Sequence, residues 1–222
     1  MSIIHYIFTR FSILDKTCKG FQLTRNNAHN IENVLFDENR LNYKFNVFHN
    51  MTVPSIKNQI YQNYVWLIFT SNYLPQKYKS ILEKYSCDKI KIIYVENFNE
   101  MSEYIKNTLK NLDHYTTMRL DDDDALSRTF LEEINKYEHE KGKIISFPNG
   151  INYTFTKNKF ILGSRISHRH IALGLTAIGF NIFRAGDHSK LDQKNIQVIE
   201  IPTKDSYYLC CSDFCDTKRK FN

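Results

Sequence analysis

Short apolar runs alternate with amphipathic segments through the first 140 residues of the chain. Runs rich in β-branched and aromatic residues predict strands at 3–11, 45–52, 64–70, 89–95 and 115–120. Apolar residues at helical spacing, or polar segments with a capping residue such as Ser55, predict helices at 30–39, 55–62, 75–86, 99–112 and 127–140. Such alternation is typical of an α/β fold with a mostly parallel sheet and helices on both faces.

The pattern changes after residue 140. A strand is predicted at 143–147, a β-hairpin at 153–162 with its turn at Lys157 and Asn158, a helix at 168–178, and short strands at 180–185 and 197–201. The tail from Lys204 has no clear pattern. We expect a single domain over residues 1–222, with mixed β elements in its second half and a division near residue 126.

Composition narrows the class of protein. Hydrophobic residues make up 42% of the 222 residues, and the formal net charge of +6 is spread as scattered Lys rather than as a dense basic run. Neither feature predicts nucleic-acid binding. Five cysteines without a regular framework argue against a secreted disulfide scaffold. The start of the chain lacks the features of a signal peptide and no run has the length of a membrane span, so we expect a cytoplasmic protein.

Four consecutive aspartates, Asp121 to Asp124, follow the predicted strand 115–120 and precede a predicted helix. The carboxyl end of a strand is where ligands bind in open α/β sheets. If the chain is still extended there, Asp121 and Asp123 point to the same side and can hold Mg²⁺ or Mn²⁺ together with substrate phosphates. Asp122 then faces the other way, toward a sugar or ribose hydroxyl. Asp124 either contacts substrate or caps the next helix. The alternative interpretation is a solvated acidic loop.

Three other sets of polar residues are candidates for a site. Asp187 and His188 follow Gly186 in a predicted loop, where His188 can supply a metal ligand and Asp187 a general base. At the end of the first strand, Arg10 can bind a phosphate and Phe11 can pack on a base. Arg119 can pair with Asp121 or reach a nucleotide. The second half also holds a polar, basic patch formed by Ser164, Arg165, His168, Arg169 and His170. This patch either contacts the acceptor or the leaving diphosphate, or is simply the solvated start of a helix.

Three segments resemble the nucleotide-sugar glycosyltransferases of the GT-A type. They are Thr9-Arg10-Phe11, the Pro54-Ser55 segment with the apolar run 64–69 that follows it, and Arg119-Leu120 with the four aspartates. Their order is most similar to the rhamnosyltransferase group of family 2-like transferases. The resemblance covers roughly residues 3–190. The chain departs from the usual pattern at Thr70-Ser71-Asn72, where such enzymes place an Asp that binds the nucleobase. It also lacks the Glu-Asp motif that supplies their catalytic base.

The resemblance implies a Rossmann-like domain that transfers a sugar, rhamnose or another hexose, to a glycan or other hydroxyl acceptor. Residues 1–126 would bind the nucleotide-sugar donor and residues 127–222 the acceptor. The resemblance implies Asp121, Asp123 and His188 as ligands of Mn²⁺ or Mg²⁺. From the residues themselves we expect Asp187 and Asp124 to act in catalysis. The donor is expected to contact Thr9, Arg10, Phe11, Arg119, Asp121 and Asp122.

Two other functions use the same residues differently. A metal-dependent phosphohydrolase or nuclease would hydrolyse phosphate esters without a sugar acceptor, although a two-metal site would need further clustered ligands. A non-catalytic carbohydrate-binding α/β domain would bind without any need for the aspartates.

Overall fold

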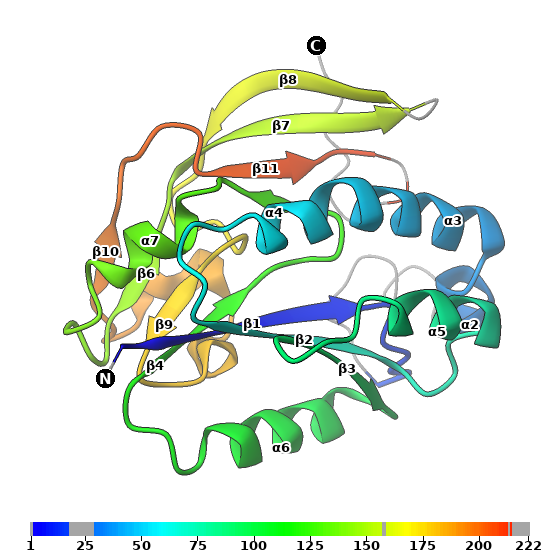
Figure 1. Ribbon diagram of the computed structural model, residues 1–222, viewed down its shortest axis with the longest axis horizontal. Coiled ribbons are helices and arrows are strands. Elements are labelled where there is room, and N and C mark those ends of the chain that lie inside the picture. Colours follow the sequence, from blue (N-terminus) through cyan, green and yellow to red (C-terminus); the bar gives the residue numbers. More distant parts are fainter. Residues whose placement is uncertain (1, 18–28, 157–158, 213, 215–222) are drawn as a thin grey trace.

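Seven strands form the larger of two sheets, in the order β10-β6-β9-β4-β1-β2-β3 (Figure 1). The computed structural model describes residues 2–17, 29–156, 159–212 and 214. The strands of this sheet are β1 Ile4–Phe11, β2 Tyr64–Ser71, β3 Ile90–Val95, β4 Tyr115–Arg119, β6 Ile144–Ser146, β9 Thr176–Ile178 and β10 Val198–Glu200. All neighbouring strands are parallel except β9, which runs antiparallel to β4 and β6. The predicted mostly parallel α/β sheet is confirmed.

Helices cover both faces of this sheet. Alternate residues of β1 enter different apolar clusters: Ile7 packs with the α3–α5 side, and Phe8 packs with α6. Figure 1 shows α6 on one side of the sheet and α3 and α4 on the other. The helical segments are α2 Ile31–Leu35, α3 Glu38–Val47, the π-helix η1 Phe48–Thr52, α4 Val53–Lys57, α5 Gln76–Glu83, α6 Phe98–Leu109, α7 Phe130–Asn135, and the 3₁₀ helices η2 Ile182–Ala185 and η3 His188–Gln193.

A second, four-stranded sheet has the order β5-β11-β7-β8. Its strands are β5 Ala125–Leu126, β7 Asn149–Thr156, β8 Lys159–Ser167 and β11 Tyr207–Cys210. Tyr153, Phe155 and Cys210 of this sheet pack against Val47 of α3. The α3–η1–α4 segment therefore lies between the two sheets (Figure 1). The predicted hairpin is confirmed as β7 and β8, both longer than expected, and its predicted turn residues lie outside the described part.

Several local predictions are wrong. Residues 45–52 are helical rather than extended, because Phe45, Phe48 and Thr52 recur at helical spacing and are all buried. The helix that Ser55 was predicted to cap begins earlier, and the Ser55 hydroxyl donates to the Thr52 carbonyl instead. Residues 127–140 form a helix only over α7.

The second half holds three further differences. Residues 168–178 form turns and β9 instead of a helix, since His170 (φ 55°) and Gly174 (φ 70°) both have left-handed backbones. The segment 180–185, predicted to be a strand, instead contains the 3₁₀ helix η2, whose N-cap is Asn181. The tail contributes β11, which pairs with β5 and β7. None of the helices in the described residues is long and apolar enough to cross a membrane.

Gly174 offers a test of this packing. A Cβ atom there would lie 2.5 Å from Cζ of Phe130, in a residue whose φ is +70°. Left-handed strain and overpacking together predict that Gly174→Ala lowers the free energy of unfolding by about 2–4 kcal/mol. Gly142→Ala is the matched control, because Gly142 has φ +86° and no atom within 4 Å of a new Cβ. Equal losses of unfolding free energy for the two variants, measured by urea unfolding, would show that the clash with Phe130 contributes nothing.

Candidate functional site at the carboxyl ends of β1 and β4

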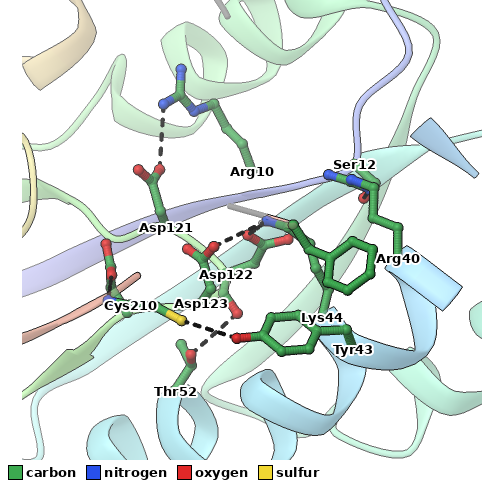
Figure 2. Close-up of polar contacts among 12 residues, drawn as sticks. Arg10, Ser12, Arg40, Tyr43, Lys44, Thr52, Asp121, Asp122, Asp123 and Cys210 are labelled. Atoms are coloured by element: carbon green, nitrogen blue, oxygen red, sulfur yellow. Dashed lines mark hydrogen bonds and ion pairs between the residues drawn. The ribbon is translucent and has the colours of Figure 1, made fainter. Parts of the chain in front are cut away.

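Arg10 and Asp121 meet at the carboxyl edge of the large sheet. Strands β1 and β4 are parallel neighbours with Phe8 opposite Arg119, so the residues that follow in each chain segment emerge side by side. Arg10 Nη2 donates to Asp121 Oδ1 at 3.4 Å (Figure 2). The Asp121 side chain is 43% exposed. The two residues that the sequence placed on the ends of separate strands are thus in contact at the surface.

The four aspartates form a turn rather than an extended run. The Asp124 amide donates to the Asp121 carbonyl at 3.3 Å, which closes a turn over these residues. The predicted alternation of side chains therefore does not apply, and Asp121 and Asp123 lie in different surroundings. Asp121 faces Arg10, whereas Asp122, Asp123 and Asp124 are buried.

Lys44 of α3 is the partner of two of the buried carboxylates. Its Nζ lies 2.5 Å from Asp122 Oδ1 and 3.4 Å from Asp123 Oδ2 (Figure 2). Thr52 of η1 also donates to the Asp122 carbonyl, at 3.2 Å. Asp122 was expected to face a sugar hydroxyl, and the structure instead directs it into the protein.

Asp124 is held by the second sheet. Its Oδ1 accepts a hydrogen bond from the Cys210 amide of β11 at 2.9 Å. It does not cap the next helix: the N-cap of α7 is Thr129. Burial, reinforced by the charges of Asp123 and Asp121, raises the pKa of Asp124 well above its usual value. Burial likewise raises the pKa of Asp122 to about 6, against the opposing charge of Lys44.

The ring of Phe183 packs against two arginines, Arg10 and Arg119, beside Asp121. Phe183 of η2 lies with its ring centroid 5.4 Å from Cζ of Arg10 and 5.7 Å from Cζ of Arg119. Burial and the nearby Arg10 charge lower the pKa of Arg119 to about 10. Its Nε atom is buried and has no hydrogen-bond partner among the described residues. Two like charges held this close, one with an unused donor, favour an anionic ligand.

Asp187 and His188 reach the same edge from the second half of the chain. Partial desolvation raises the pKa of Asp121, but the charges of Arg10, Arg119 and Lys44 outweigh it and hold that pKa below its usual value. Burial and the charge of Arg119 lower the pKa of His188. The charges of Asp187 and Asp121 act in the opposite direction but do not outweigh them. Asp187 is exposed and caps η3, accepting from the Ser189 amide at 3.0 Å. The second half thus lies within electrostatic range of Asp121.

Other predicted residues lie away from this edge. Thr9 is buried and accepts a hydrogen bond from Trp66 Nε1 at 2.9 Å. Phe11 packs in the core against Phe45 and Phe48. In the basic patch, Arg165 pairs with Asp205, and Arg169 pairs with Glu200 and Asp192. Both arginines of the patch therefore already form ion pairs within the protein.

One buried oxygen of the acidic turn, on the inner side away from the exposed Asp121, suits a divalent cation. Oδ2 of Asp122 is buried without a hydrogen-bond partner in the described part of the chain, and carboxylate oxygens are the ligands that Mg²⁺ and Mn²⁺ prefer. No group of three His, Cys, Asp or Glu side chains in that part lies together in an arrangement that would hold a metal by itself. Substrate oxygens would have to complete the coordination, as is usual for Mg²⁺.

Phe183 and Lys44 were not predicted. A phenylalanine in a short apolar segment has no feature that distinguishes it from a core residue, and a lysine inside a helix ordinarily points to solvent. The one available signal for Lys44 was its spacing from Arg40, four residues earlier, which places two basic residues on one helix face.

The ring of Phe183 can be tested directly. Removing two cation–π contacts of about 0.5–1 kcal/mol each should weaken binding of an anionic substrate roughly tenfold. We expect Phe183→Leu to raise the Kd of an anionic ligand by that factor, while Phe183→Tyr, which keeps the ring, stays near the wild-type value. Equal Kd values for the two variants would show that the ring itself has no role.

Comparison with known proteins places this chain in a family. The family model described as "Putative rhamnosyl transferase" matches residues 5–222. No curated protein sequence matches the chain. Among solved structures, S. aureus TarS 1-349 in complex with UDP-GlcNAc aligns with a TM-score of 0.54 and 9% identity, over 95% of this chain and 59% of that chain. The same fragment with UDP aligns with a TM-score of 0.50 and 10% identity, over 95% and 61%.

These results confirm the resemblance found in the sequence. The TarS fragments show the fold, and this chain spans about three fifths of their length. The family match covers nearly the whole chain, including Arg10, the four aspartates and His188. The chain therefore belongs to the putative rhamnosyl transferase family, a family of glycosyltransferases.

Proposed function

We propose that this protein transfers a sugar from a nucleoside-diphosphate donor to a hydroxyl acceptor on a glycan. The observation that carries the proposal is the contact of Arg10 with Asp121, beside Arg119 and Phe183. Two arginines at the carboxyl edge of a parallel sheet suit a diphosphate. The UDP-GlcNAc and UDP complexes of the TarS fragments support a donor of this class. Rhamnose, or another hexose, is the proposed sugar on the strength of the family match.

A divalent cation, Mn²⁺ or Mg²⁺, forms part of this proposal. Asp121 and His188 would hold it together with diphosphate oxygens. Asp121 is the exposed aspartate of the turn. His188 is near enough for the Asp121 charge to act to raise its pKa, against the larger lowering effects of burial and Arg119. Asp123, the other predicted ligand, already faces Lys44 at 3.4 Å. Such an ion offsets the negative charge that develops on a departing diphosphate.

Asp187 is the proposed general base for the acceptor hydroxyl. It is exposed and directly precedes His188 at the edge that carries Arg10 and Asp121. Its hydrogen bonds from Ser189 lower its pKa, so it is ionised at neutral pH. Asp124 is buried against Cys210, and we assign it a structural role instead. The proposed site thus draws on both halves of the chain, as expected for a single functional unit.

The proposal is tested by following release of nucleoside diphosphate from a panel of nucleotide sugars, including nucleoside-diphosphate rhamnose, with and without Mn²⁺. We expect release from one donor class, with slow transfer to water in the absence of acceptor. Hydrolysis of simple phosphate esters, together with inert nucleotide sugars, would instead identify a phosphohydrolase.

A further inference from the structure

Protein groups from three other elements hold the turn that carries the four aspartates. Lys44 contacts the carboxylates of Asp122 and Asp123, and the Cys210 amide donates to Asp124. The Tyr153 hydroxyl donates to the Asp123 carbonyl. These partners come from α3, β11 and β7, which are distant in sequence and all contact the turn.

Lys44 is the element of this set that carries positive charge. Its side chain is 10% exposed, and those of Asp122 and Asp123 are 3% and 10% exposed. A lysine this deeply buried is rare unless it is paired, and so is a buried aspartate. Each therefore requires the other, because the ammonium group contacts both buried carboxylates.

The local structure of α3 fixes Lys44 in this position. Asp37 caps the helix by accepting from the Arg40 amide at 2.9 Å, and Arg40, one turn before Lys44, donates to Ser12 Oγ at 3.1 Å. The π-helix η1 follows directly, and its Thr52 bonds to the Asp122 backbone. The helix is thus anchored to the end of β1 and to the acidic turn at once, which fixes the backbone from which Lys44 reaches the two carboxylates.

We propose that Lys44 is a positioning residue, which serves as the permanent counter-ion of Asp122 and Asp123 and leaves Asp121 as the aspartate of the turn that is open to donor and cation. The inference rests on the proposed function only for the use made of Asp121. It implies that the free protein binds a divalent cation weakly, because two of the four carboxylates are already neutralised by an ammonium group.

Removing the ammonium group should therefore create a cation site. In Lys44→Met, which keeps most of the side-chain volume, Asp122 and Asp123 would lose the ammonium group that contacts both of them. Asp122 Oδ2 is an additional unpartnered oxygen among the described atoms. We expect Mn²⁺ alone, measured by electron paramagnetic resonance at pH 8 without nucleotide, to bind Lys44→Met at least tenfold more tightly than wild type. Lys44→Arg should behave as wild type.

Lys77→Met is the matched control. Lys77 of α5 also pairs with an acidic residue, Glu38 at 2.8 Å, but its side chain is 60% exposed. Its Mn²⁺ affinity should equal that of wild type. A folded Lys44→Met variant with unchanged or weaker Mn²⁺ binding would overturn the proposal. A general loss of packing would lower thermal stability without producing a gain in metal affinity.

A second variant applies if Lys44→Met does not fold. Adding Asp122→Asn removes one of the two charges that Lys44 balances, so the double variant should regain thermal stability relative to Lys44→Met. If it does not, Lys44 is not the counter-ion. The Mn²⁺ measurement involves no nucleotide, so failure of wild type to bind nucleotide sugars would count against the proposed function and leave this inference standing.

Discussion

Asp121→Asn should reduce kcat/KM for sugar transfer by a factor of about 10²–10³, the range found when one charged or hydrogen-bonding group is removed from a preorganised site. The substitution keeps the shape of the side chain but removes the charge that faces Arg10 at 3.4 Å and that would hold the cation. Because the side chain is 43% exposed, the fold should tolerate the change. Steady-state kinetics with a saturating acceptor would measure the loss.

The control for this prediction is an exposed aspartate away from the edge. Asp88 follows Cys87 in the turn before β3, at the amino end of that strand. Asp88→Asn should leave kcat/KM unchanged. If Asp121→Asn kept activity within threefold of wild type, the acidic turn would have no part in the chemistry, and the donor would have to bind elsewhere.

Trp66→Ala should cause the largest loss of stability in the described chain. Trp66 is fully buried in the cluster between the sheet and α3. The centroids of its ring and the Phe48 ring are 5.5 Å apart, and its Nε1 donates to Thr9 Oγ1 at 2.9 Å. Truncating an aromatic residue of this kind costs about 3–5 kcal/mol. Urea unfolding would report it as a lower midpoint.

Two further variants separate the contributions of Trp66. Trp66→Phe keeps a ring but leaves Thr9 Oγ1 without its donor, so a loss of about 1–3 kcal/mol is expected. Tyr73→Ala removes a ring that is 54% exposed and should change stability by at most about 0.5 kcal/mol. A Trp66→Ala loss no greater than that of Tyr73→Ala would mean that the cluster does not support the sheet.

The parallel half of the fold is predictable because its signals are local. β1, β2 and β3 are short runs rich in β-branched and aromatic residues, and α5 and α6 have one apolar face each, so local sequence patterns identify them. The second half depends on long-range pairing. The short strand β11 has only four residues and is stabilised by contact with β5 and β7, which no local pattern indicates.

The candidate site divides in the same way. The contact between Arg10 and Asp121 follows from two strand ends on one edge of a parallel sheet, and it could be anticipated. The turn over the four aspartates could not, because it depends on tertiary partners: Lys44, Tyr153 and Cys210 draw three acidic residues inward. Phe183 reaches the arginines through η2, a segment predicted to be a strand.

The most direct test of the account is binding of nucleoside diphosphates, measured as a thermal shift with and without Mn²⁺ for wild type and Asp121→Asn. A ligand at a hundredfold excess over its Kd stabilises the folded state by about 2.7 kcal/mol, which gives a clear shift. We expect one nucleotide to stabilise wild type, more strongly with Mn²⁺, and to have little effect on Asp121→Asn. Equal shifts for the two proteins, or no shift with any nucleotide, would contradict the assignment of this edge as the donor site.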